Sequence, residues 1–135
     1  MPNGNTHIRA GAVLGALGSI VLQAKAGNGE QTDFGHVLLS TGAATLVSRL
    51  PDVLEPATSP NHRDFFHSVF FGGIVGIACR ETWNELKCEI NARRSTGQSR
   101  PNNKEVGLGL LLIVESAILL HLVMDSSTKR SLPLI

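Results

Sequence analysis

The chain is poor in charged and aromatic residues. Only 17% of its 135 residues are charged and 4% are aromatic, whereas soluble domains carry about 25% charged residues. So little charge does not suit an ordinary globule with a water-exposed surface. The hydrophobic fraction of 42% also argues against intrinsic disorder, which goes with few apolar residues and high net charge.

Net charge and cysteine are scarce as well. The net charge is +1, so nothing in the charge balance indicates nucleic-acid binding. Cys79 and Cys88 do not have the spacing of a metal site, and we expect them to be free thiols rather than a disulfide framework. The length predicts a single domain covering residues 1–135.

The apolar residues gather in four blocks, at residues 10–24, 34–47, 65–79 and 106–124. A helix needs about 20 residues to cross the hydrocarbon core of a bilayer, with about 17 as the lower limit. Only the last block reaches that length unaided. The other three fit either short membrane helices or the buried helices of a soluble bundle.

Two features favour the membrane. The blocks have no polar stripe at helical spacing, which an amphipathic surface helix would show. Gly11 with Gly15, and Gly72 with Gly76, form small-xxx-small pairs, which let helices approach closely in lipid. We therefore predict an all-α fold, a small membrane-embedded bundle of about four short antiparallel transmembrane helices.

The first block has an alternative reading. Arg9, the apolar run to Leu22 and the sequence A-K-A at residues 24–26 resemble a signal peptide with its cleavage site. The basic region is a single arginine, however, and three glycines interrupt the run. These features favour a retained first helix.

The three connections differ in character. Residues 25–33 are predicted to form a short polar turn. Residues 48–64 contain three prolines, so we expect an ordered loop between helices two and three. Residues 80–105 form a polar and basic connecting segment, helical over 81–92 and broken at 95–103.

An antiparallel arrangement of four helices would gather histidine and aspartate on one side. The chain changes sides three times, so the N-terminus, the second loop and the C-terminus share one end, and of the five histidines only His36 lies at the other. His121 and Asp125 are four residues apart and project from one helix face. Imidazole with carboxylate favours Zn²⁺, Mn²⁺ or Fe²⁺ over Mg²⁺ or Ca²⁺. The candidate metal ligands are His7, Asp52, His62, His67, His121 and Asp125.

Each of these residues also has a structural interpretation. A histidine at a helix end is commonly a cap or an interface residue. Asp52 could start a turn or cap a helix, and Asp125 could end the last helix. Both interpretations stay open at this point.

Two stretches and the chain's end resemble a known family. Residues 49–56, RLPDVLEP, and 61–68, NHRDFFHS, are similar to the paired signature L-P-D-x-D-[HE]-P and H-R-G-x-T-H-S. Residues 121–128, HLVMDSST, resemble its H-x-x-x-D-x-x-T, and His7 precedes the first apolar helix as in that family. The chain thus resembles the YdjM-like family of LexA-regulated, membrane-bound metal-dependent hydrolases.

The resemblance implies a multi-pass protein of a bacterial inner membrane, encoded by the bacterium or by a phage. The same six histidines and aspartates would hold a divalent transition metal, Zn²⁺ first, with Mn²⁺ or Fe²⁺ as alternatives. A metal-activated water would hydrolyse a phosphoester or lipid-like substrate, the last step being an analogy with zinc phospholipases. Membrane lipid is the expected partner, no nucleic acid is indicated, and a homo-oligomer stays open.

The chain departs from the family pattern at three positions. Leu54 stands in place of the second aspartate of the first signature, and Asp64 and Phe66 replace the glycine and threonine of the second. These changes leave the histidine and aspartate set intact but remove a carboxylate and a hydroxyl.

The catalytic roles fall on residues beside the ligands. Glu55 or Asp64 would relay a proton, and Arg63 would neutralise an anionic oxygen, although Arg63 beside Asp64 could form only a surface ion pair. Glu115 lies inside the longest apolar run and is interpreted first as a structural polar anchor.

Two rival hypotheses remain. One is a non-catalytic membrane bundle, an interaction or assembly factor that uses the metal as a structural clamp, and the loss of a carboxylate at Leu54 supports it. The other is a soluble helical phosphoesterase. The six Lys and Arg within 80–105 favour a cytoplasmic location for that segment, which would place the candidate site on the opposite side.

Overall fold

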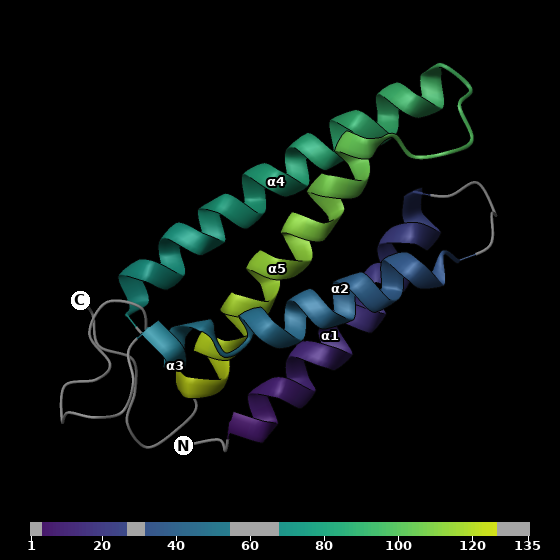
Figure 1. Cartoon of the computed structure of the whole chain (residues 1–135). Coiled ribbons are helices and arrows are strands. Elements are labelled where there is room, and N and C mark those ends of the chain that lie inside the picture. Colours follow the sequence, from purple (N-terminus) through teal and green to yellow (C-terminus); the bar gives the residue numbers. More distant parts are fainter. Residues whose placement is uncertain (1–3, 27–31, 55–67, 127–135) are drawn as a thin grey trace, which may run out of the picture.

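A computed structural model of the chain describes residues 4–26, 32–54 and 68–126, and these residues form helices without any strand (Figure 1). The predicted all-α bundle is confirmed. The described helices are α1 (Gly4–Ala26), α2 (Phe34–Val47), α3 (Leu50–Leu54), α4 (Val69–Ser95) and α5 (Asn103–Ser126).

Helix α5 is the centre of the bundle. It holds the longest apolar run and packs against α1, α2, α3 and α4 (Figure 1). Its inward face carries Ile113 and Ala117, which pack with Ala44 of α2. The chain therefore folds as two hairpins, α1 with α2 and α4 with α5, joined along α5.

Glycine lets α1 lie close to α2. A Cβ atom at Gly11 would stand 2.7 Å from the carbonyl oxygen of Ala44, and one at Gly15 would stand 2.6 Å from that of Ser40. Both contacts are with backbone and too short for a side chain, so the close approach predicted for this pair is confirmed. The second pair differs, because a Cβ at Gly76 would meet no described atom within 4 Å. The prediction of a close approach at Gly76 is wrong for the described residues.

Helix α4 is longer than the sequence indicates. Residues 80–95 continue the third apolar block as one helix instead of starting a separate connecting segment. Ser68 begins the helix by accepting a hydrogen bond from the backbone N–H of Phe71 at 3.0 Å. Gly97 follows its end with a φ of +69°, the left-handed conformation that glycine adopts at helix C-termini. The connection to α5 is thus only a short loop.

A buried arginine joins the helices at the end of the bundle that carries the loop between α4 and α5, called the loop end below. Arg93 is 2% exposed, and its Nε lies 2.9 Å from Glu105 of α5. Its two terminal nitrogens donate to Glu105 Oε1 and to the backbone carbonyls of Gln98, Ser99 and Ala26. All five N–H groups of the guanidinium are therefore used, and α1, α4, α5 and the loop are joined through one side chain.

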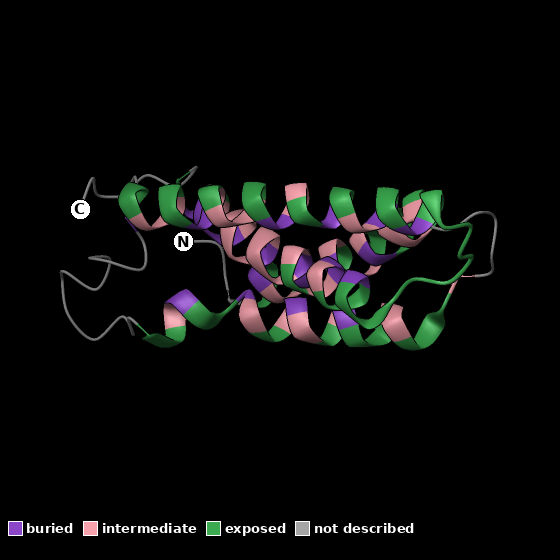
Figure 2. Cartoon of the chain, turned by 90° about the horizontal axis from the view of Figure 1, so that it is seen from above, coloured by how far each residue is buried: buried purple, intermediate pink, exposed green. Residues whose placement is uncertain are grey.

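Many large apolar side chains are exposed on the outer surface of the bundle. Exposed residues face outward and buried ones inward (Figure 2), and the exposed set includes Phe34 at 76%, Leu46 at 78% and Leu17 at 58%. Among the described residues, three segments are long and apolar enough to cross a membrane: Asn5–Ala26, Phe34–Leu54 and Asn103–Ser126. Large exposed apolar surfaces mark membrane or protein contacts, so the described surface fits a membrane protein.

Candidate metal centre

Four of the six candidate ligands converge at one end of the bundle. His7 lies in the first turn of α1, Asp52 lies in α3, and His121 and Asp125 lie near the end of α5. The start of α1, helix α3 and the end of α5 meet at the same end (Figure 1). The antiparallel alternation expected from the sequence is the cause of this convergence.

Imidazole nitrogens and carboxylate oxygens face each other at this end. His121 Nε2 lies 3.4 Å from Asp125 Oδ2 and 3.6 Å from Asp52 Oδ1, and His7 Nε2 lies 3.5 Å from Asp125 Oδ1. The two imidazole rings lie side by side, with centroids 4.1 Å apart and planes inclined by 30°. Asp125 thus contacts both histidines, one with each oxygen.

Burial differs among the four side chains. His7, His121 and Asp125 are 2%, 1% and 2% exposed, whereas the Asp52 side chain is 36% exposed. Buried ionisable groups are costly unless they are paired or coordinate a metal. The cluster is therefore closed on the side of the bundle core and accessible on the side of α3.

A backbone carbonyl orients His121. The carbonyl oxygen of Ser48, at the C-terminal cap of α2, lies 2.6 Å from His121 Nδ1. A carbonyl only accepts, so Nδ1 carries the hydrogen, and the lone pair of the neutral ring is on Nε2. That atom faces Asp52 and Asp125. Metal-ligating histidines are typically oriented in this way by their other ring nitrogen.

The distances fit a shared divalent cation. One ligand atom from each of His7, Asp52 and His121 lies within 4.8 Å of the others. Two atoms that share a tetrahedral Zn²⁺ at about 2.0–2.1 Å lie roughly 3.3–3.5 Å apart, close to the 3.6 Å between His121 Nε2 and Asp52 Oδ1. Mixed nitrogen and oxygen donors also suit Zn²⁺, Mn²⁺ and Fe²⁺.

The remaining predicted site residues fall between α3 and α4. The structure brings together His7, Asp52, His121 and Asp125 and leaves the rest of the set a prediction. Two ligands and three catalytic candidates lie outside the described residues, namely His62, His67, Glu55, Arg63 and Asp64.

Leu54, which aligns with an aspartate of the signature that the chain resembles, projects away from the cluster. Asp52 and Leu54 are two residues apart in α3, so their side chains diverge by about 200° around the helix axis. Leu54 is 48% exposed, in line with an outward direction. An aspartate at this position would not reach the group formed by His7, Asp52 and His121, so its loss removes no ligand from that group.

Glu115 and His36, two polar residues outside the cluster, each make a hydrogen bond between helices. Thr82 of α4 donates a hydrogen bond of 3.2 Å to Glu115 Oε1, so Glu115 anchors α4 to α5, as predicted. His36 lies at the opposite end of the bundle, where its Nδ1 is 2.9 Å from Ser19 Oγ. Sequence reasoning missed the role of Ser48, since a backbone carbonyl acceptor leaves no signature in residue identity.

Comparison with protein-family models, with curated proteins and with solved structures finds no match to this chain.

Proposed function

We propose that the chain is a membrane-bound metal-dependent hydrolase acting on phosphoester or lipid-like substrates. The observation that supports this proposal most directly is the cluster of His7, Asp52, His121 and Asp125, drawn from three helices and oriented by the Ser48 carbonyl. Residues so distant in sequence, meeting at a largely buried point, fit a ligand set better than a group of independent helix caps.

His7, Asp52 and His121 would hold the cation, with Asp125 contacting both imidazoles from the other side. Such a cation supplies Lewis acidity, which lowers the pKa of coordinated water toward about 7 and makes a nucleophile available at neutral pH. Ser48 keeps the His121 lone pair directed at the site. Asp52, the exposed member, borders the open side from which a substrate would enter.

The surroundings of the open side favour a lipid-like substrate. Leu50, Val53 and Leu54 of α3 are 41%, 64% and 48% exposed, so the helix that carries Asp52 presents apolar side chains on its outward side. A substrate with acyl chains would bury this surface. Glu55 or Asp64 as proton relay, and Arg63 as the group that neutralises an anionic oxygen, remain predictions from the sequence.

The activity test uses purified protein in detergent micelles. The substrates are bis(4-nitrophenyl) phosphate and a fluorescent phosphatidylcholine, each assayed with added Zn²⁺, Mn²⁺ or Fe²⁺. We expect turnover that Asp52→Asn lowers by at least 100-fold. The matched control is Glu81→Gln, which neutralises an exposed carboxylate on α4 and should leave turnover unchanged.

A structural metal clamp is the second candidate function. The burial of His7, His121 and Asp125 favours it, because structural sites are closed whereas catalytic sites keep an open position. A clamp predicts tightly retained metal, unfolding on chelation and no turnover of either substrate. Loss of turnover in Asp52→Asn with normal folding would favour the hydrolase instead.

A further inference from the structure

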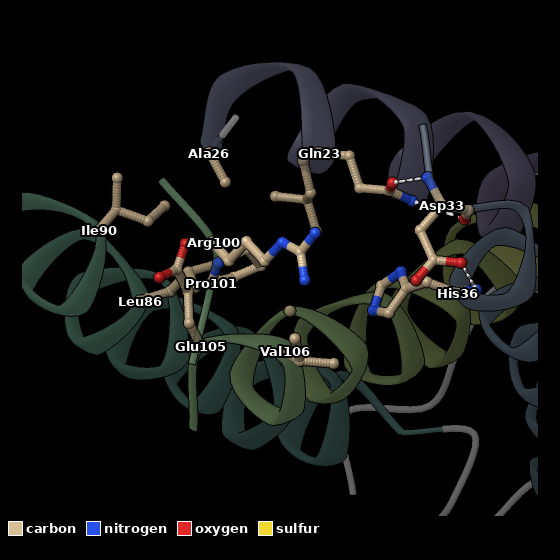
Figure 3. A pocket seen from close by; sticks show the side chains of 12 residues that line it. Gln23, Ala26, Asp33, His36, Leu86, Ile90, Arg100, Pro101, Glu105 and Val106 are labelled. Atoms are coloured by element: carbon tan, nitrogen blue, oxygen red, sulfur yellow. Dashed lines mark hydrogen bonds between the residues drawn. The ribbon is translucent and has the colours of Figure 1, made fainter. Parts of the chain in front are cut away.

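A second site lies at the end of the bundle opposite the metal centre. A cavity of about 400 Å³ opens between the α1–α2 hairpin and the α4–α5 hairpin. It is lined by the end of α1, the start of α2, the second half of α4 and the residues around the start of α5 (Figure 3). Volumes of this size are typical of sites for small molecules.

The floor of the cavity is apolar. Leu22 of α1, Leu86 and Ile90 of α4, and Val106 of α5 all contribute to it. Figure 3 shows Leu86 and Ile90 on the α4 side of the cavity and Val106 on the α5 side. A ligand that fills this space therefore needs an apolar part.

Two of the acidic groups at the cavity are already engaged. Glu105 forms the buried ion pair with Arg93 at 2.9 Å. Asp33 caps α2 by accepting the backbone N–H of His36 at 3.2 Å, where the positive end of the helix dipole offsets its charge. Gln23 spans the gap to the backbone of Asp33, accepting from its N–H at 2.6 Å and donating to its carbonyl.

His36 and Arg100 are the hydrogen-bond donors that face the cavity. Gln23 donates to Ser19 Oγ at 3.1 Å, so the hydroxyl hydrogen of Ser19 is available for His36 Nδ1 at 2.9 Å. The neutral imidazole then carries its hydrogen on Nε2. The guanidinium of Arg100 extends into the cavity toward the His36 ring (Figure 3). Within the described residues, no hydrogen bond or ion pair engages this guanidinium.

The position of the cavity suits a lipid. It lies where the apolar segments of α1, α2 and α5 all reach one end, which is the level of the headgroups for helices that cross a bilayer. Lys25, Lys87 and Arg94 lie at the same end, together with the carboxylates of Glu85 and Glu89. In the cavity itself, Arg100 is the cationic group that suits a phosphate headgroup between membrane helices.

We propose that this cavity binds a membrane phospholipid. Arg100 and His36 donate to the phosphate oxygens of its headgroup, and one acyl chain lies along Leu22, Leu86 and Val106. Arginine suits phosphate because its planar fork offers paired N–H groups. The site uses neither the residues nor the end of the bundle assigned to hydrolysis.

Native mass spectrometry of the full chain in mild detergent tests this inference. The probe is short-chain phosphatidylglycerol titrated into delipidated protein, with glycerol phosphate and inorganic phosphate as parallel arms. We expect lipid binding at least tenfold tighter than binding of either chain-free phosphate, and a tenfold or greater loss of lipid affinity in Arg100→Ala. The control Arg80→Ala removes an exposed arginine of α4 outside the cavity and should change the affinity less than twofold.

A second variant tests the apolar floor separately. Val106→Trp would fill the path of the acyl chain while leaving Arg100 in place, and we expect it to weaken lipid binding but not glycerol phosphate binding. Equal lipid affinities for wild type, Arg100→Ala and Arg80→Ala would overturn the proposal. Equal affinities for lipid and inorganic phosphate would identify the occupant as a free anion and overturn it as well.

Discussion

Both ends of the bundle bury ionisable side chains, but the contacts that offset the cost of burying them differ. At the loop end, the Arg93 guanidinium meets Glu105 and three backbone carbonyls, and each of its five N–H groups has an acceptor. At the other end, imidazole and carboxylate atoms face each other at 3.4–3.6 Å, beyond the usual hydrogen-bond length of 2.7–3.2 Å.

The two ends therefore contribute differently, one to the stability of the fold and the other to a candidate metal site. A guanidinium surrounded by acceptors at bonding distance locks the helices together. The two imidazoles and the Asp52 carboxylate lie within 4.8 Å of one another and form a set of Lewis bases, which is what a divalent cation requires. The Arg93 end thus stabilises the fold, and the end with His7, Asp52, His121 and Asp125 is the one for which we propose a function.

The largest effect is expected from breaking the Arg93 end. Arg93→Met leaves Glu105 buried without its partner, and such a loss costs about 3–5 kcal/mol of unfolding free energy. Thermal unfolding in detergent, followed by circular dichroism, would measure it. Arg80→Met, an exposed arginine on the same helix, is the control. A melting temperature equal to that of the control would show that the Arg93 end does not hold the fold.

The next largest effect links helix packing to the metal end. Gly11→Ala places a Cβ 2.7 Å from Ser48 Oγ and from the Ala44 carbonyl, and overpacking of this kind costs about 1–3 kcal/mol. Because Ser48 orients His121, we also expect weaker metal binding, measured by competition with a zinc chelator.

Substitutions at two further glycines distinguish the loss of stability from the loss of metal binding. Gly15→Ala clashes with the backbone at Ser40, about two helical turns from Ser48, and should lower stability with less effect on metal binding. Gly42→Ala meets nothing within 4 Å and should be neutral or stabilising by up to about 1 kcal/mol. If Gly11→Ala and Gly15→Ala weaken metal binding equally, the Ser48 contact does not orient the site.

A smaller effect is expected midway between the ends. Thr82→Val removes the hydrogen bond to Glu115 while nearly preserving the side-chain shape, and we expect a loss of about 1–3 kcal/mol because the acceptor lies inside an apolar segment. Glu115→Leu, measured by the same unfolding curve, should cost less when combined with Thr82→Val than when made alone. Strictly additive losses would contradict the coupling of the two residues.

The smallest effect concerns an exposed contact at the loop end. The hydrogen bond from Lys104, 2.7 Å away, lowers the pKa of Glu89 from its ordinary value of 4.5. A lowered pKa in the folded state adds stability that is fully present above that value and is lost as the pH falls below it. Glu89→Gln should make the free energy of unfolding slightly less dependent on pH between about 5 and 3. Identical pH profiles of wild type and variant would show that this contact does not contribute to stability.

Much of the fold could be predicted from residue patterns. The limits of α2 coincide with the second apolar block at 34–47, because the Asp33 cap marks its start and the apolar block ends at Val47. The continuation of α4 through residues 80–95 was harder to predict, since charged residues such as Arg80 and Glu81 suit a loop as well as a helix. What keeps that segment helical is its packing on α5 through Leu86 and Ile90.

The candidate site, too, could be predicted from the sequence only in part. His121 and Asp125 could be paired from their spacing of four, and alternation of antiparallel helices placed His7 and Asp52 beside them. The ligating role of His62 and His67 stays a prediction. The acceptor from Ser48 and the contacts of Arg93 with Ala26, Gln98 and Ser99 involve backbone carbonyls, which every residue carries. Only the folded backbone reveals which carbonyl lies near which side chain.

Metal content is the most direct test of the central claim that His7, Asp52, His121 and Asp125 form a metal centre. Full-length protein purified in detergent without chelator would be analysed by inductively coupled plasma mass spectrometry, together with Asp52→Asn and the control Glu81→Gln. We expect at least one equivalent of a divalent transition metal in wild type and control and a marked loss in Asp52→Asn. Wild-type protein without stoichiometric metal, even after incubation with Zn²⁺, Mn²⁺ or Fe²⁺, would contradict it.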